Sequence, residues 1–120
     1  MKIMKMKFEI TPIALGRPRI NTKNLGRYLP ARSQEFKKEL GILAKASYRG
    51  EPLSKPLKVI LRFYKPVKET SRRYGDTDNL AKAVLDACNG ILWVDDSQII
   101  ELHAYKYKGA GKIEMEVLEY

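Results

Sequence analysis

Apolar and polar residues alternate near both ends of this chain, and this pattern constrains the fold more than any other feature. Residues 4–10 alternate apolar side chains with charged ones. Residues 112–119 do the same, with Ile113, Met115 and Val117 as apolar positions. Successive side chains of a strand point to opposite faces, so both segments are predicted to be strands with one buried side.

Two segments between these strands have apolar residues at helical spacing. The first helix is predicted to begin at Ser33, as its N-cap, and to run to about Tyr48. The second helix is predicted over about residues 77–89, with Gly90 placed to terminate it.

Two further strands are predicted at residues 57–64, which are rich in β-branched and aromatic side chains, and at about 98–107. The run Gly109-Ala110-Gly111 joins the second of these to the last strand, which is typical of a β-hairpin. A chain of 120 residues suits one compact domain. The predicted fold class is therefore α/β: a single small domain with a mixed β-sheet of about four strands and two helices, in the order β-α-β-α-β-β.

Residues 11–30, between the first strand and the first helix, show no periodicity and hold three prolines, two glycines and four cationic residues. A segment of this length without regular structure is uncommon in a compact domain and is usually functional or mobile. We therefore expect a basic, mobile arm at about residues 11–30, within a single domain that spans residues 1–120.

The composition excludes several classes of protein. The chain has 23 Lys+Arg and 14 Asp+Glu, a net charge of +9, and its 44% of hydrophobic residues is too high for a disordered chain. No run approaches the roughly 18 apolar residues of a membrane span, and the lysine-rich N-terminus has no signal-peptide apolar region. The single cysteine, Cys88, excludes an internal disulfide and a multi-cysteine zinc site. We expect a soluble, cytoplasmic protein with an anionic partner, which could be nucleic acid, a membrane surface or an acidic protein.

The charges are segregated along the chain. Residues 1–73 hold 19 basic and 5 acidic residues, a net charge of +14, whereas residues 74–120 hold 4 basic and 9 acidic residues, a net charge of −5. One explanation is that the two parts neutralise each other across the fold. However, all the aspartates of the protein lie within one window of 21 residues: Asp76, Asp78, Asp86, Asp95 and Asp96.

Three of these aspartates have the pattern of a metal site. Asp76 and Asp78 are two residues apart at the start of the second predicted helix, and in an extended segment both side chains project to one side. Asp96 follows an apolar run that is expected to enter the core. Carboxylates without cysteine or a nearby histidine suit Mg²⁺ or Mn²⁺, which also bind substrate phosphate. Lys82, one helical turn after Asp78, could neutralise charge on that phosphate.

Each of these residues also has a structural explanation. Asp78 could be the N-cap of the second helix. Lys82 could join Asp78 and Asp86 in a salt-bridge ladder on the surface, and Asp95-Asp96 could form a turn. These explanations account for the residues singly, but they leave the confinement of every aspartate to one window unexplained. A metal site that acts on a phosphate-containing polyanion is therefore the favoured hypothesis.

At this point the chain resembles the RusA-type Holliday-junction resolvases. The resemblance lies in the run Asp76-x-Asp78-Asn79-Leu80-x-Lys82-x-x-x-Asp86, followed by Asp95-Asp96 after an apolar segment. The segment Gly16-Arg17-Pro18-Arg19, with Tyr28 and a basic helix after it, is similar to the family's N-terminal arm. The resemblance implies a homodimeric, Mg²⁺-dependent endodeoxyribonuclease of the nucleoid that nicks four-way DNA junctions symmetrically in recombination and repair. A two-fold dimer offers two equivalent sites to such a junction.

The resemblance also implies a role for each matched residue. It makes Asp76, Asp78 and Asp96 the catalytic, metal-binding aspartates. It makes Lys82 the catalytic lysine and Mg²⁺, or Mn²⁺, the cofactor, with no small-molecule cofactor and no membrane partner. The supporting positions are Asn79, Asp86 and Asp95. Contacts to DNA phosphates are expected from seven basic residues: Arg17, Arg19, Lys23, Arg27, Arg32, Arg72 and Arg73.

Two other functions stay open. The same metal chemistry could act on flaps or other branched DNA. Alternatively, the chain could be a basic nucleic-acid-binding protein without catalysis, in which the aspartates are structural.

Overall fold

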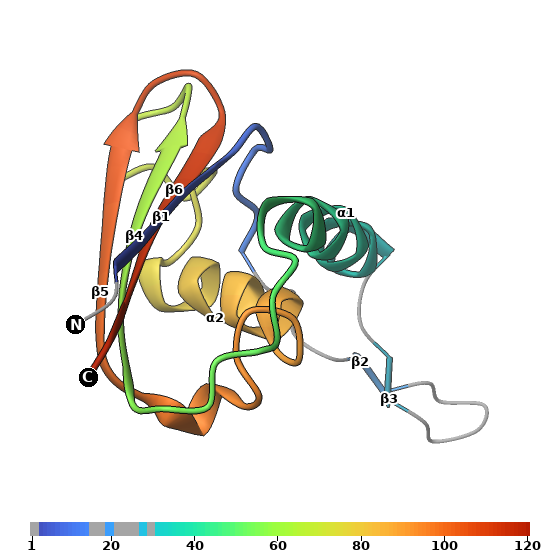
Figure 1. Ribbon diagram of the computed structural model, residues 1–120. Helices are drawn as coiled ribbons and strands as arrows, with labels where there is room; N and C mark the ends of the chain where they lie inside the picture. The colour runs from blue at the N-terminus through green and yellow to red at the C-terminus, as the bar shows by residue number, and fades with distance from the viewer. Residues whose placement is uncertain (1–2, 15–18, 21–26, 29–30) are drawn as a thin grey trace.

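The computed structural model describes residues 3–14, 19–20, 27–28 and 31–120, and within these ranges it forms a mixed four-stranded sheet and two α-helices (Figure 1). The predicted fold class and the predicted order of the main elements are confirmed. The main elements are β1 (Ile3–Phe8), α1 (Ala31–Ser47), β4 (Leu57–Lys65), α2 (Thr77–Cys88), β5 (Ile99–Lys108) and β6 (Lys112–Glu119). The shorter elements are β2 (Arg19–Ile20), β3 (Arg27–Tyr28) and the 3₁₀ helix η1 (Asp96–Gln98).

The strands of the main sheet lie in the order β1-β6-β4-β5. β4 and β5 are parallel, and the β4–β6 and β1–β6 pairs are antiparallel. The predicted hairpin across Gly109-Ala110-Gly111 is therefore wrong, because β4 lies between β5 and β6 and the connection passes over its end (Figure 1). The apolar core-facing residues of β4, such as Leu57 and Leu61, are fully buried. This burial agrees with a central position, where the strand has a neighbouring strand on each side.

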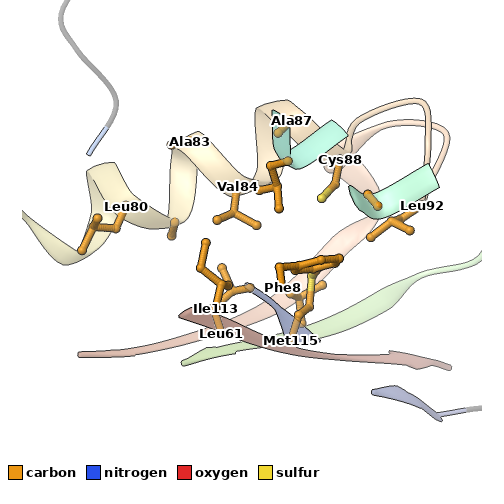
Figure 2. Packing of buried hydrophobic residues seen from close by; sticks show 14 of the residues in the cluster. Phe8, Leu61, Leu80, Ala83, Val84, Ala87, Cys88, Leu92, Ile113 and Met115 are labelled. Carbon is orange, nitrogen blue, oxygen red and sulfur yellow. The ribbon is translucent and has the colours of Figure 1, made fainter. Parts of the chain in front are cut away.

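Both helices lie on the same face of the sheet and cover the core (Figure 1). Figure 2 shows side chains of α2, such as Leu80 and Val84, facing Ile113 and Met115 of β6. Trp93 is completely buried, as the apolar run before Asp95 predicted. The core is thus a single layer between the sheet and two helices, and none of the described helices lies over the other face of the sheet.

The ends of the helices agree in part with the predictions. α1 begins at Ala31, and the prediction that Ser33 is its N-cap is wrong. Ser33 lies inside the helix because it continues the buried stripe of Phe36, Leu40 and Ala44. The predicted end of α2 is confirmed, since Gly90 follows the last helical turn with a positive φ of 79°.

The predicted basic arm is described only in part. β2 and β3 form a short antiparallel pair whose backbone register pairs Arg19 with Tyr28 and Ile20 with Arg27. Arg17 and Lys23 lie outside the described residues, so their role in DNA binding, like the mobility of the arm, stays a prediction. Within the described residues no helix is both long enough and apolar enough to cross a membrane.

Candidate active site

The segment before α2 is anchored to the sheet by Tyr74, which is completely buried. Its hydroxyl oxygen lies 2.8 Å from the carbonyl oxygen of Phe63 and 2.6 Å from that of Tyr107, and it accepts a hydrogen bond from the Tyr107 N–H. Burial raises the pKa of Tyr74, so the hydroxyl keeps its proton. Tyr74 therefore ties the approach to α2 to the ends of both β4 and β5.

Two lysines hold the backbone on either side of Tyr74. The Lys65 ammonium donates to the carbonyl oxygens of Arg73, at 3.1 Å, and Tyr74, at 3.2 Å. The Lys106 ammonium donates to the carbonyl oxygen of Gly75 at 3.0 Å. Both ammonium groups also lie over the Tyr74 ring, at 5.8 Å and 5.2 Å from its centroid. Three successive carbonyl groups are thereby fixed directly before Asp76.

Gly75 is the residue that allows this turn. Its φ of +98° is a conformation that residues with a side chain rarely adopt. A Cβ added there would lie 2.8 Å from the Cβ of Ala14. The turn therefore needs glycine both for its backbone conformation and for the space beside residue 14.

Asp76 and Asp78 lie where α2 begins, as predicted. Asp76 is the N-cap residue, and its carbonyl oxygen accepts a hydrogen bond from the Leu80 N–H at 2.9 Å. Its carboxylate makes no capping hydrogen bond. The alternative that Asp78 is the N-cap is wrong, because Asp78 lies in the first turn of the helix. Both residues are exposed, and neither carboxylate has a hydrogen bond or ion pair with the described residues.

Lys82 follows Asp78 by one turn and is also exposed. No ion pair joins it to Asp78 or Asp86 within the part of the chain that the structure describes. The alternative that Lys82 forms a salt-bridge ladder with Asp78 and Asp86 is therefore wrong. Asn79 and Asp86 are half-buried on the same helix. The lysine ammonium is left available to a ligand beside the aspartate pair.

Asp95 and Asp96 lie near the other end of α2. The Asp95 carboxylate caps η1 by accepting from the Ser97 N–H at 3.0 Å, and the hydrogen bonding of Ser97, supported by Asn89, lowers the pKa of Asp95. Asp96 is the first residue of η1 and is exposed. Because α2 has 12 residues and is thus about 18 Å long, this end is remote from Asp76. Among the described residues, no three acidic, histidine or cysteine side chains gather as a metal site, so the predicted set with Asp96 stays a prediction.

The donor chemistry of the Asp76–Asp78 pair nevertheless fits a hard divalent cation. Mg²⁺ is usually bound by one or two protein carboxylates, with waters and substrate phosphate completing its coordination. Two exposed carboxylates that are not used as caps or in ion pairs are suitable ligands of that kind. The pair can therefore take part in a Mg²⁺ or Mn²⁺ site that includes phosphate from a bound nucleic acid.

Several cations lie in segments next to this pair. Arg72 and Arg73 are exposed in the segment before α2, as is Arg32 on α1. Burial and the nearby charge of Arg32 lower the pKa of Lys65. Of the predicted phosphate contacts, Arg72 and Arg73 thus lie directly before the start of α2, Arg32 lies on α1 near Lys65, and Arg19 and Arg27 lie in the β2–β3 pair.

The comparison of the sequence with known families covers almost the whole chain and all of the candidate site. The model of the family described as "Endodeoxyribonuclease RusA" matches residues 9–118. The chain belongs to the RusA endodeoxyribonuclease family. Relatives are found at 27% and 30% identity. The chain is 27% identical to the uncharacterized protein YqaN of Bacillus subtilis (strain 168), over 90% of each chain. It is 30% identical, over 80% of each chain, to the crossover junction endodeoxyribonucleases RusA of Escherichia coli (strain K12) and Shigella sonnei (strain Ss046).

The RusA match includes residues that the sequence analysis missed. Lys65 and Lys106 hold the segment before Asp76, yet neither was among the predicted site residues. A signal was present, because Lys65 continues the core-facing alternation of Val59, Leu61 and Phe63. A lysine at a core-facing strand position needs hydrogen-bond acceptors, and for Lys65 the carbonyl groups of Arg73 and Tyr74 supply them.

Proposed function

We propose that this chain is a Mg²⁺-dependent endodeoxyribonuclease that resolves four-way DNA junctions by paired, symmetric nicks, in the cytoplasm at the nucleoid. The observation that carries the proposal is the exposed Asp76–Asp78 pair, which begins α2 on a segment held by Lys65 and Lys106. The RusA family match and the names of the junction-specific relatives support DNA junctions as the substrate.

Each group near the pair has a role in phosphodiester hydrolysis. Asp76 and Asp78 would hold the metal, which when bound orients the attacking water and stabilises negative charge on the scissile phosphate. Lys82 would neutralise charge on that phosphate from the next turn of α2. Arg72 and Arg73 would contact neighbouring phosphates and so hold the strand against the start of the helix.

A homodimer is part of the proposal. Asp96 lies at the other end of α2 from Asp76, so one chain does not gather the three predicted metal-binding carboxylates. In a two-fold dimer, each copy can place its Asp96 beside the aspartate pair of its partner, and the two composite sites are then equivalent. Two equivalent sites suit two opposed cuts in a junction.

The test is cleavage of labelled four-way junction, flap, duplex and single-stranded DNA, with and without Mg²⁺. Wild type should nick the junction symmetrically and only with the metal. Asp78→Asn should abolish nicking while junction binding persists, because loss of a carboxylate also relieves repulsion of phosphate. Glu39→Gln, an equal change of charge on the exposed face of α1, is the matched control and should leave nicking intact.

Other results would decide against the proposal. Equal cleavage of flaps and junctions would make the protein a nuclease for branched DNA in general. Binding without cleavage, together with indifference to Asp78→Asn, would make it a basic nucleic-acid-binding protein. If the Asp78→Asn variant nicked the junction as fast as wild type, the assignment of the metal site would be wrong. Nicking by a strictly monomeric protein would remove the composite site.

A further inference from the structure

The two helices leave a groove on the side of the molecule that faces away from the sheet. They approach closely at Gly41, where an added Cβ would lie 3.6 Å from Ile91 Cδ1 and 3.7 Å from the carbonyl oxygen of Ala87. Above this contact the surface is hollowed into a groove of about 730 Å³. Its floor is formed by these small and apolar residues, so a ligand can approach the helix backbones.

The walls of the groove are cationic. α1 contributes Lys37, Lys38 and Lys45, all of them exposed, and Asp86 of α2 is the acidic residue among those that line it. None of the three lysines forms a salt bridge with a described residue. The groove therefore has an excess of positive charge that the folded chain itself does not neutralise, and it favours an anionic ligand.

The groove and the candidate active site share one face of α2. Asp78, Lys82 and Asp86 follow each other at intervals of four residues, so they share that face. Asp78 belongs to the aspartate pair, whereas Asp86 lines the groove. From Asp78 to Asp86 this face is about 12 Å long, a length that spans about three to four phosphates of one DNA strand.

Several of the cations on the opposite side of the molecule are paired with acidic side chains, although Lys5 forms no salt bridge with a described residue. On the uncovered face of the sheet, Arg62 lies 2.5 Å from Glu116, and Lys58 lies 3.7 Å from Glu101. Charges that are paired within the fold contribute less to the attraction of a polyanion. Of the two faces, the groove between the helices is thus the better match for DNA.

We propose that the α1–α2 groove binds the sugar-phosphate backbone of a DNA arm, several phosphates away from the one that is cut. Lys37, Lys38 and Lys45 contact phosphates, and the site provides affinity and orientation without taking part in the chemistry. This inference rests on the proposed function for its ligand, DNA. It assigns a binding role to three lysines that are neither in the aspartate motif nor among the seven basic residues expected to contact phosphates.

The test compares two triple variants that each remove three positive charges. The groove variant is Lys37→Gln, Lys38→Gln, Lys45→Gln, and the control variant is Lys5→Gln, Lys7→Gln, Lys58→Gln on the uncovered face of the sheet. Binding of a fluorescent four-way junction is measured by anisotropy without Mg²⁺ at several salt concentrations. Nicking is measured separately in single turnovers with saturating protein and Mg²⁺.

The groove variant should bind the junction about tenfold or more weakly than wild type, and the slope of log K against log salt should fall by about two to three. Its nicking rate at saturation should stay within about twofold of wild type, because the scissile phosphate is elsewhere. The control variant should change affinity and slope much less. In addition, bound junction should protect the three groove lysines from acetylation, as read by mass spectrometry.

Three results would overturn the groove assignment. The first is equal weakening of binding by both triple variants, since net charge alone would explain it. The second is equal acetylation of the groove lysines in free and bound protein. The third is loss of nicking at saturation in the groove variant, which would place these lysines in the chemistry. If wild type binds DNA but cuts none with Mg²⁺, the proposed nuclease function fails, while the binding comparison still decides the groove.

Discussion

The ammonium group of Lys106, on the edge strand β5, donates a hydrogen bond at 3.0 Å to the carbonyl oxygen of Gly75, directly before Asp76. Lys65, on the neighbouring strand β4, holds the two preceding carbonyl groups. The position of the aspartate pair therefore depends on two side chains that come from two neighbouring strands of the sheet. Such positioning affects the reaction rate more than it affects the stability of the fold, because a small displacement of a catalytic group lowers the rate.

Lys106→Met should lower the rate of junction nicking roughly tenfold, because the segment before Asp76 loses its hydrogen bond from β5. The free energy of unfolding should fall by only about 1 kcal/mol. Lys108→Met, at an exposed position on the same strand, is the control and should change the nicking rate little. Single-turnover nicking and urea unfolding measure the two effects. Equal rates in the two variants would show that the bond to Gly75 does not position the site.

Gly75→Ala should destabilise the fold more than Gly90→Ala. Both glycines have a positive φ, which costs a residue with a Cβ about 1–2 kcal/mol. At position 75 the new methyl group would also lie 2.8 Å from Ala14 Cβ, whereas at position 90 it would meet nothing within 4 Å. Urea unfolding followed by the fluorescence of the single, buried Trp93 should give a difference of about 1 kcal/mol or more between the variants. If the two variants lost similar free energies of unfolding, residue 14 would move aside to accommodate the new methyl group.

Lys82→Ala should reduce nicking roughly 100-fold at saturating protein, with much less effect on junction affinity. The reason is that the Lys82 ammonium, which forms no salt bridge with a described residue, lies one turn from Asp78 and in the proposed mechanism would neutralise charge that develops at the phosphate. Lys82→Arg keeps the charge and should recover part of the rate. Nicking rates and anisotropy measured on the same preparations test this prediction. Equal losses of rate and affinity would make Lys82 a phosphate anchor instead.

Cys88 should be unreactive toward thiol reagents at pH 8 until the domain unfolds. Its side chain is completely buried against the core, and burial raises the pKa of the thiol from 9.0 to about 12. Since the unfolded chain releases this proton first, the thiol lowers the free energy of unfolding as pH rises above about 9, by up to about 1.4 kcal/mol per pH unit. Urea unfolding of wild type and Cys88→Ala between pH 8 and 11 isolates this contribution. Identical pH dependence in the two proteins would contradict it.

Features that depend on burial could be predicted from the sequence. The alternation in residues 4–10 and 112–119 reports which side of each strand meets the core, and both strands are present. Gly90 ends α2 because a positive φ after a helix favours glycine. These signals are local, because the pattern that predicts each element lies in the residues that form it.

Features that depend on which segments become neighbours could not be predicted in this way. The Gly109-Ala110-Gly111 run indicates a tight connection, but it does not reveal that β4 lies between the two strands it joins. Likewise, the spacing of the aspartates places Asp76 and Asp78 together, but the separation of Asp96 depends on the length and direction of α2. The lysines that hold Gly75 and its neighbours come from strands whose positions are set only by the tertiary fold.

The place of β6 in the sheet also determines when the domain can form. β6 is the only neighbour of β1 in the described sheet, and it is also one of the two neighbours of β4. The pairing of Met6 with Met115 joins residues about as far apart in sequence as the chain permits, which slows folding. During synthesis, β1 therefore leaves the ribosome long before its partner exists. A nascent chain that stops before Lys112 exposes open strand edges on β1 and β4, and through such edges it would aggregate with other molecules.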